Sequence, residues 1–97
     1  MFKIILRQEA IDDLNDIWNY TFEKWSEKQA DKYYTTIKLA CKRIGDDPNI
    51  GREYHNVVSR LVGLKSGKHI IFYNSNDEVE IIRILHERMD LKTKLTE

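Results

Sequence analysis

The chain has 97 residues, which predicts one domain spanning residues 1–97 with a small core. It is 41% hydrophobic and 33% charged, a composition typical of a soluble globular domain and unlike a disordered tail. Because 16 Lys and Arg residues balance 16 Asp and Glu residues, we expect no direct nucleic-acid binding by bulk charge, and any such binding needs a local patch.

The first predicted element is a strand over residues 2–6, where the apolar run FKIIL is short and partly β-branched. From Glu9 onward, apolar residues recur every three or four positions. This spacing predicts an amphipathic helix that ends near residues 24–26. Trp18 and Trp25 fall on its apolar stripe, so we expect both rings to pack internally.

A second helix is predicted to follow almost without a connector. Ser26 and Gln29 match a capping box, and apolar residues keep the helical spacing over residues 30–44. Gly45 is a natural stop, and Pro48 prevents continuation. Because the connector is so short, the two helices should form an antiparallel hairpin.

The remainder reads as short strands separated by turns. Turn-forming residues cluster at 46–53, 66–67 and 74–77. We predict strands, or a strand and its connection, over residues 54–58 and 60–64, strands over 69–73 and 79–85, and a short or frayed helix over 91–95.

This order of elements predicts an α+β fold. An N-terminal strand is followed by an antiparallel helical hairpin, which packs on a C-terminal, mostly antiparallel sheet of three to four strands. The first strand should join that sheet along one side, since this buries its apolar residues.

The last strand, residues 79–85, is apolar on both faces apart from two charged positions. We therefore expect it to lie in the middle of the sheet. Strict alternation places Ile84, His86 and Arg88 on one face and Ile81 on the other.

The charged residues at the end of this strand allow two interpretations. His86 and Arg88 could bind or cleave RNA, with the histidine as general acid–base and the arginine stabilising a phosphate. Alternatively, Arg83 and Arg88 could form structural ion pairs with Glu87 and Asp90. The residues alone favour the ion pairs, because arginine at a strand end is common.

Other chemistry has little support in the sequence. His55, His69 and His86 share no metal-ligand spacing, and the lone Cys41 on an apolar helical stripe is expected to be a small core residue. We therefore expect no metal and no cofactor.

The acids of the first helix, Asp12, Asp13 and Asp16, are interpreted as a solvated face rather than as catalytic carboxylates. The chain also has no signal segment and no apolar run long enough for a membrane span. We therefore expect a cytoplasmic protein without membrane contact.

Five motifs in succession resemble one family, the ParE branch of the RelE/ParE toxin superfamily. They are D-x-x-x-I-x-x-Y at 13–20, W-S-x-x-Q-A-x-x-Y at 25–33, D-P-x-x-G-R at 47–52, H-x-I-F-Y at 69–73 and I-L-H-x-R-M-D at 84–90. The resemblance runs from about residue 3 to residue 95. Each motif alone is weak, but their order and the chain length make the match specific.

The resemblance implies a bacterial toxin of a type II toxin–antitoxin system, associated with growth inhibition and plasmid stabilisation. Such a toxin would be neutralised by direct binding of a ParD-like antitoxin. ParE-type members inhibit DNA gyrase and so block replication, whereas RelE-type members are metal-independent ribonucleases that cut mRNA on the ribosome. The zero net charge and the absence of a tyrosine after Arg88 favour the ParE branch.

For a ParE-type toxin we expect no catalytic residues, and a target-binding surface formed by Arg60, Arg83, His86 and Arg88. In the alternative, ribonuclease interpretation, the catalytic residues would be His86, Arg88 and Arg60.

The antitoxin is expected to add a strand to an open sheet edge and a helix to the hairpin groove. Tyr20, Tyr33 and Tyr34 are candidate contacts for it, because tyrosines often anchor such interfaces. Tyr20 lies one step off the apolar stripe and is therefore expected to be exposed.

Overall fold

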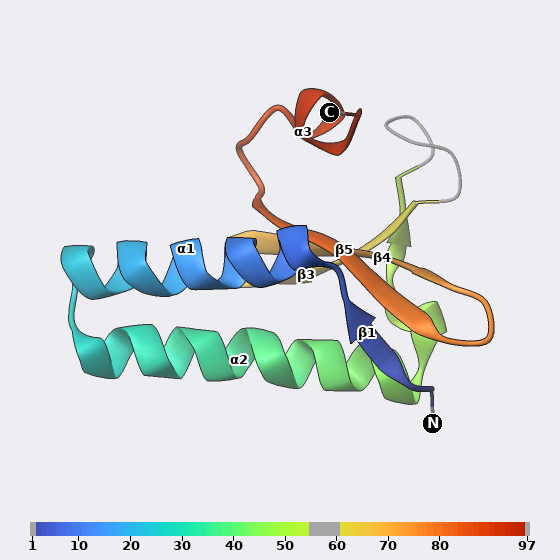
Figure 1. Cartoon of the computed structure of the whole chain (residues 1–97), viewed down its shortest axis with the longest axis horizontal. Coiled ribbons are helices and arrows are strands. Elements are labelled where there is room, and N and C mark those ends of the chain that lie inside the picture. The colour runs from blue at the N-terminus through green and yellow to red at the C-terminus, as the bar shows by residue number, and fades with distance from the viewer. Residues whose placement is uncertain (1, 55–60, 97) are drawn as a thin grey trace.

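A computed structural model describes residues 2–54 and 61–96 of the chain, and the side chains of residues 2–54 and 61–95. Within these residues, a five-stranded sheet has the strand order β1-β5-β4-β3-β2, and helices α1 and α2 cover one of its faces (Figure 1). The elements are β1 (Ile4–Leu6), α1 (Gln8–Lys24), α2 (Glu27–Asp46), the 3-10 helix η1 (Pro48–Ile50), β2 (Arg52–Glu53), β3 (Val62–Ser66), β4 (His69–Ser75), β5 (Val79–His86) and α3 (Leu91–Thr96).

The predicted α+β layout is confirmed. β1 joins the sheet in parallel at its edge, beside β5, and the remaining pairs are antiparallel. Residues 55–60, which include His55 and Arg60, lie outside the described residues. Most of the strand predicted over residues 54–58 falls in this range. No helix in the described ranges combines the length and apolarity that crossing a bilayer requires.

Helix α2 begins as its sequence predicts and ends slightly later. The Ser26 side chain accepts a hydrogen bond from the Gln29 backbone N–H at 3.1 Å, which confirms the N-cap. Gly45 does not stop the helix, which continues to Asp46. A Cβ at Gly45 would lie 2.6 Å from Cδ1 of Ile4, so a larger residue here would force the Ile4 side chain to shift where β1 approaches the helix.

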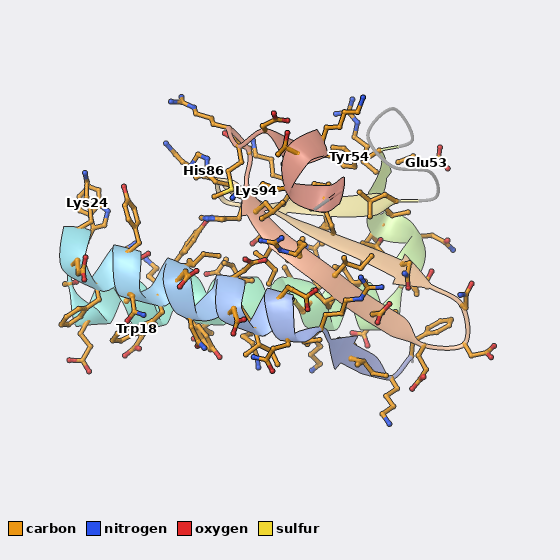
Figure 2. All side chains as sticks on the ribbon, turned by 45° about the horizontal axis from the view of Figure 1, so that its top comes forward. Trp18, Lys24, Glu53, Tyr54, His86 and Lys94 are labelled. Carbon is orange, nitrogen blue, oxygen red and sulfur yellow. The ribbon has the colours of Figure 1, made fainter. Side chains whose placement is uncertain are left out.

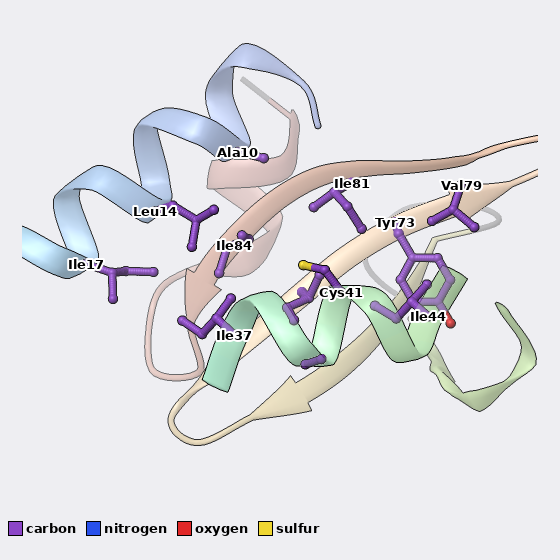
Figure 3. Close-up of a cluster of buried hydrophobic side chains, with 12 residues drawn as sticks. Ala10, Leu14, Ile17, Ile37, Cys41, Ile44, Tyr73, Val79, Ile81 and Ile84 are labelled. Atoms are coloured by element: carbon purple, nitrogen blue, oxygen red, sulfur yellow. The ribbon is translucent and has the colours of Figure 1, made fainter. Parts of the chain in front are cut away.

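The main core lies between the helical hairpin and the sheet. Figure 3 shows Leu14 and Ile17 of α1 and Ile37 of α2 directed toward Ile84 of β5. Cys41 is buried among them, as predicted. Burial of each large side chain of this kind contributes about 1.5–3 kcal/mol.

A second, smaller cluster lies on the opposite face of the sheet, where Leu91 and Leu95 of α3 pack against it. Its fully or nearly fully buried members are Leu61, Ile70, Phe72 and Leu85. The sheet is therefore covered on both faces, which explains why β4 and β5 are almost continuously apolar.

The apolar stripe of α1 is only partly buried, contrary to the prediction for Trp25. This side chain is 72% exposed, because Trp25 is the C-cap residue and its φ of −127° and ψ of −82° are not helical. Helical spacing therefore no longer sets the direction of its side chain. Trp18 is half-buried: its ring stacks on Phe22 at 5.2 Å, and its Nε1–H donates to Asp31 at 2.9 Å.

Strand β5 lies between β1 and β4, which confirms its predicted interior position. Its register against β4 pairs Arg83 with Phe72 but Ile81 with Tyr73, so Ile82 is an extra, bulged residue. As a result, Ile81 and Ile84 both belong to the core under the helices. The predicted strict alternation along this strand was wrong for that reason.

Candidate functional site

A groove of about 810 Å³ lies between the helical hairpin and the ends of the sheet strands. Figure 2 shows Lys24, the last residue of α1, and His86, at the end of β5, on the same side of the molecule. The residues that line the groove are Asp16, Ile17, Tyr20, Thr21, Lys24, Trp25, Gln29, Tyr33, Gly67, Lys68, His69, His86, Arg88 and Met89.

One wall of the groove carries exposed apolar side chains. Tyr20 is 62% exposed, as predicted, and Trp25 and Met89 are exposed beside the same groove. The Lys24 ammonium lies 5.9 Å from the centre of the Tyr20 ring, a cation–π distance. Exposed aromatic side chains around a concave surface are typical of binding sites.

The floor of the groove is built by Tyr33 of α2 and the turn between β3 and β4. Gly67 makes that turn with φ of +60°. The Tyr33 hydroxyl accepts a hydrogen bond from the Lys68 backbone N–H at 3.1 Å and lies 3.4 Å from the Ser66 carbonyl oxygen. It is also 2.6 Å from Nδ1 of His69. One tyrosine therefore fixes the turn and the imidazole relative to the hairpin.

Two imidazoles lie side by side on this floor. The rings of His69 and His86 are 5.3 Å apart, edge to face, because the two residues are paired across β4 and β5. Burial, together with the neighbouring His86, lowers the pKa of His69 to about 4, so its imidazole is neutral at pH 7. Nδ1 of His86 accepts a hydrogen bond from the Arg88 backbone N–H at 3.1 Å.

The side chain of Arg88 is exposed at the rim of the groove, next to that hydrogen bond. The neighbouring Glu87 carboxylate is instead directed to Lys65, at 2.8 Å, and this hydrogen bond lowers the pKa of Glu87. Glu87 is thus paired with Lys65 of β3, while Arg88 lines the groove.

Arg83 has a different environment. Its guanidinium donates to both carboxylate oxygens of Asp13, at 2.8 and 3.0 Å, and it does not line the groove. Asp13 also accepts the Ile84 backbone N–H at 2.9 Å. The prediction that Asp13 belongs to a solvated face was wrong, because this acid covers the edge of β5 beyond the end of β1.

The groove therefore brings together four of the predicted site residues from opposite ends of the chain, namely Tyr20, Tyr33, His86 and Arg88. Tyr34 lies elsewhere, half-buried against the core with the Lys38 ammonium 5.8 Å from its ring centre. Arg60 lies outside the described residues.

Trp25, Lys68 and His69 are among the lining residues that were not predicted as site residues. The signal for His69 was present in the H-x-I-F-Y motif, whose first residue it is. Within residues 2–54 and 61–96, no three His, Cys, Asp or Glu side chains gather as a metal site would require.

Comparisons with known proteins agree on one family. Residues 4–91 match the family model described as "ParE toxin of type II toxin-antitoxin system, parDE". The chain is 33% identical to Toxin ParE1 of Caulobacter vibrioides over 93% of this chain and 94% of the relative. It is 30% identical to Toxin ParE1 of Mycobacterium tuberculosis over 96% of this chain and 97% of the relative.

A solved structure, titled "Chromosomal ParDE TA system from P. aeruginosa", has a similar fold. It superimposes with a TM-score of 0.78 at 19% sequence identity, covering 89% of this chain and 96% of that chain. At this identity the likeness concerns the fold alone.

Proposed function

The chain belongs to the ParE toxin family of type II toxin–antitoxin systems, and from this premise we propose that it stops growth by inhibiting DNA gyrase until a ParD-like antitoxin binds it. The observation that carries the proposal is the family match over residues 4–91, which includes nearly all the elements that form the groove. Gyrase inhibition is typical of ParE toxins.

The groove supports a toxin that acts by binding rather than by chemistry. His69 is neutral and hydrogen-bonded to Tyr33, and Nδ1 of His86 accepts a hydrogen bond from the Arg88 backbone N–H. Exposed Trp25 and Arg88 are the types of side chain that dominate protein interfaces.

We assign the gyrase contact to His86 and Arg88, together with Arg60. We assign Arg83 a role in positioning β5 against α1 instead, because its guanidinium donates two hydrogen bonds to the Asp13 carboxylate.

The antitoxin would use the same groove. Tyr20 is exposed on its wall, whereas Tyr33 forms its floor and Tyr34 lies outside it. If one groove takes both partners, the antitoxin neutralises the toxin by occupying the surface that gyrase needs. We therefore propose Tyr20 as the principal antitoxin contact of the three tyrosines.

One observation favours a second candidate function, a RelE-type endoribonuclease. His86 and Arg88 share the groove with Lys68 and the hydroxyl of Tyr33, a set that could move protons and hold a phosphate. This activity would cut mRNA in a translation extract, which a gyrase inhibitor leaves intact.

A supercoiling assay tests the proposed function. Purified toxin at micromolar concentration should leave relaxed plasmid unsupercoiled in the presence of gyrase and ATP, and heat-denatured toxin should not. Undisturbed supercoiling by gyrase at that concentration of folded toxin would rule the proposal out.

A further inference from the structure

The two imidazoles on the floor of the groove each have one ring nitrogen that acts as a hydrogen-bond acceptor within the protein. The Nδ1 atom of His86 accepts the Arg88 backbone N–H at 3.1 Å, so this nitrogen carries no proton. A neutral imidazole has one ring proton, and in His86 it therefore lies on Nε2. His86 thus offers an N–H donor.

The same assignment follows for His69 from the contacts of the Tyr33 hydroxyl. This hydroxyl has a single proton and two possible acceptors: Nδ1 of His69 at 2.6 Å and the Ser66 carbonyl at 3.4 Å. The shorter contact takes the proton, since a separation of 3.4 Å is long for an O–H donor. Nδ1 of His69 is then an acceptor, and because the pKa of about 4 keeps the ring neutral, its proton also lies on Nε2.

Neither Nε2 atom has a hydrogen-bond partner among the described residues. Since no buried side-chain nitrogen or oxygen in these residues lacks a partner, both Nε2 atoms are accessible to solvent. Lys68 and Arg88 line the same groove and add an ammonium and a guanidinium. The one carboxylate among the described lining residues is Asp16, which comes from α1 rather than from the floor. Two imidazoles that each offer an N–H and two cationic side chains therefore line a concave space with one carboxylate among its described lining residues, which is the composition of an anion site.

We propose that this groove binds single-stranded nucleic acid, with one phosphate held by His69, His86, Lys68 and Arg88 and an adjoining base packed on Trp25. A phosphate fits this donor set better than a carboxylate, because it offers more acceptor positions to four separate donors. Trp25 is 72% exposed on the same groove, and base stacking on such a ring is insensitive to sequence. A volume of about 810 Å³ suits a ligand the size of a nucleotide.

Such binding is compatible with zero net charge, because it rests on a local patch rather than on the whole surface. It also stands independently of gyrase, since it concerns direct contact between the toxin and a nucleic-acid strand.

Fluorescence anisotropy with a 3′-labelled decathymidylate tests the proposal on the full-length protein at about 50 mM salt, where phosphate contacts are strongest. We expect saturable binding that weakens about fivefold or more in Lys68→Gln and in Arg88→Gln. The matched control is Lys42→Gln, which removes an exposed lysine of α2 outside the groove and should leave affinity unchanged. Melting curves of all three variants establish that they are folded.

Nitrogen-15 NMR of the histidine side chains supplies a second readout. Decathymidylate should shift the Nε2 resonances of both His69 and His86. Absence of binding at 50 mM salt, or equal weakening by Lys42→Gln, would overturn the proposal. So would displacement of the oligonucleotide by hexaglutamate at equal concentration, because the groove would then be a site for acidic protein segments. None of these results bears on the supercoiling assay.

Discussion

Asp13 and Arg83 lie 70 positions apart in the chain and form a two-pronged ion pair, with both carboxylate oxygens accepting from the guanidinium at 2.8 and 3.0 Å. Their side chains are only 12% and 22% exposed. The same carboxylate accepts the Ile84 backbone N–H, so it joins α1 to the part of β5 that β1 does not cover. This link holds the hairpin against the strand that delivers His86 to the groove.

Removal of this carboxylate should destabilise the fold. Asp13→Ala leaves a shielded guanidinium and a backbone N–H without their acceptor, which costs about 2–4 kcal/mol. For a domain of this size, that corresponds to a loss of roughly 10 °C or more in melting temperature. Asp12→Ala is the control, since its exposed carboxylate accepts from the Gln8 side chain and from no other group among the described residues. Equal melting temperatures for the two variants would refute a structural role of Asp13.

The hydroxyl of Tyr73 should stabilise the segment after α2. It donates to the Pro48 carbonyl at 2.7 Å and accepts the Gly51 backbone N–H at 3.0 Å, from a side chain with no exposed surface. Tyr73→Phe should therefore cost about 1–2 kcal/mol in urea denaturation. Tyr20→Phe, at an exposed position, should change the free energy of unfolding very little. An unchanged free energy of unfolding in Tyr73→Phe would show that water replaces these hydrogen bonds without loss of stability.

Stability should fall as the solution becomes acidic, beginning above the range in which carboxylates titrate. The pKa of His69 is lowered in the folded state from 6.5 to about 4, so the unfolded chain binds a proton that the folded chain resists. Its contribution to stability is complete above pH 6.5 and is lost as the pH falls toward 4. The pKa values of Glu80 and Glu87 are lowered from 4.5, so the contributions of these two carboxylates to stability are lost only as the pH falls below 4.5.

Melting temperatures between pH 7.5 and 4.8 measure this effect, because the lowered carboxylates remain ionised over most of that interval. In His69→Gln the slope of melting temperature against pH should become much flatter, although the variant itself is less stable. An unchanged slope would assign the acid sensitivity to another group.

Much of the fold could be predicted because its determinants are local. Helical spacing and the Ser26 cap define the hairpin, and the apolar run of 79–85 identifies an interior strand. The bulge at Ile82 could not be predicted, since it depends on how β5 pairs with β4. The exposure of Trp25 was missed because helical spacing stops being valid at the C-cap.

The site was predictable only in part, for a related reason. His86 and Arg88 are visible as polar residues that end an apolar strand. Tyr33 and His69 lie in the same groove because of tertiary contacts that the sequence does not reveal. These are the pairing of His69 with His86 across two strands and the contact of the Tyr33 hydroxyl with His69. Asp13 looked like a surface acid because its partner, Arg83, is so distant in sequence.

His86→Ala and Arg88→Ala should remain folded and lose toxicity. Both side chains lie at the groove rather than in the core, so the melting temperature should change by no more than a few degrees. Growth after induction without antitoxin measures toxicity, and Lys42→Ala serves as a fully toxic control. A large drop in melting temperature would mean that these residues are structural instead.

The most direct measurement of the central claim is the amount of linear plasmid that accumulates when purified gyrase, ATP and supercoiled DNA are incubated with the toxin and the reaction is stopped with detergent. We predict that linear DNA increases with wild-type toxin and not with folded Arg88→Ala. An unchanged level of linear DNA at micromolar wild-type toxin, with supercoiling intact, would contradict the proposal that this protein inhibits gyrase.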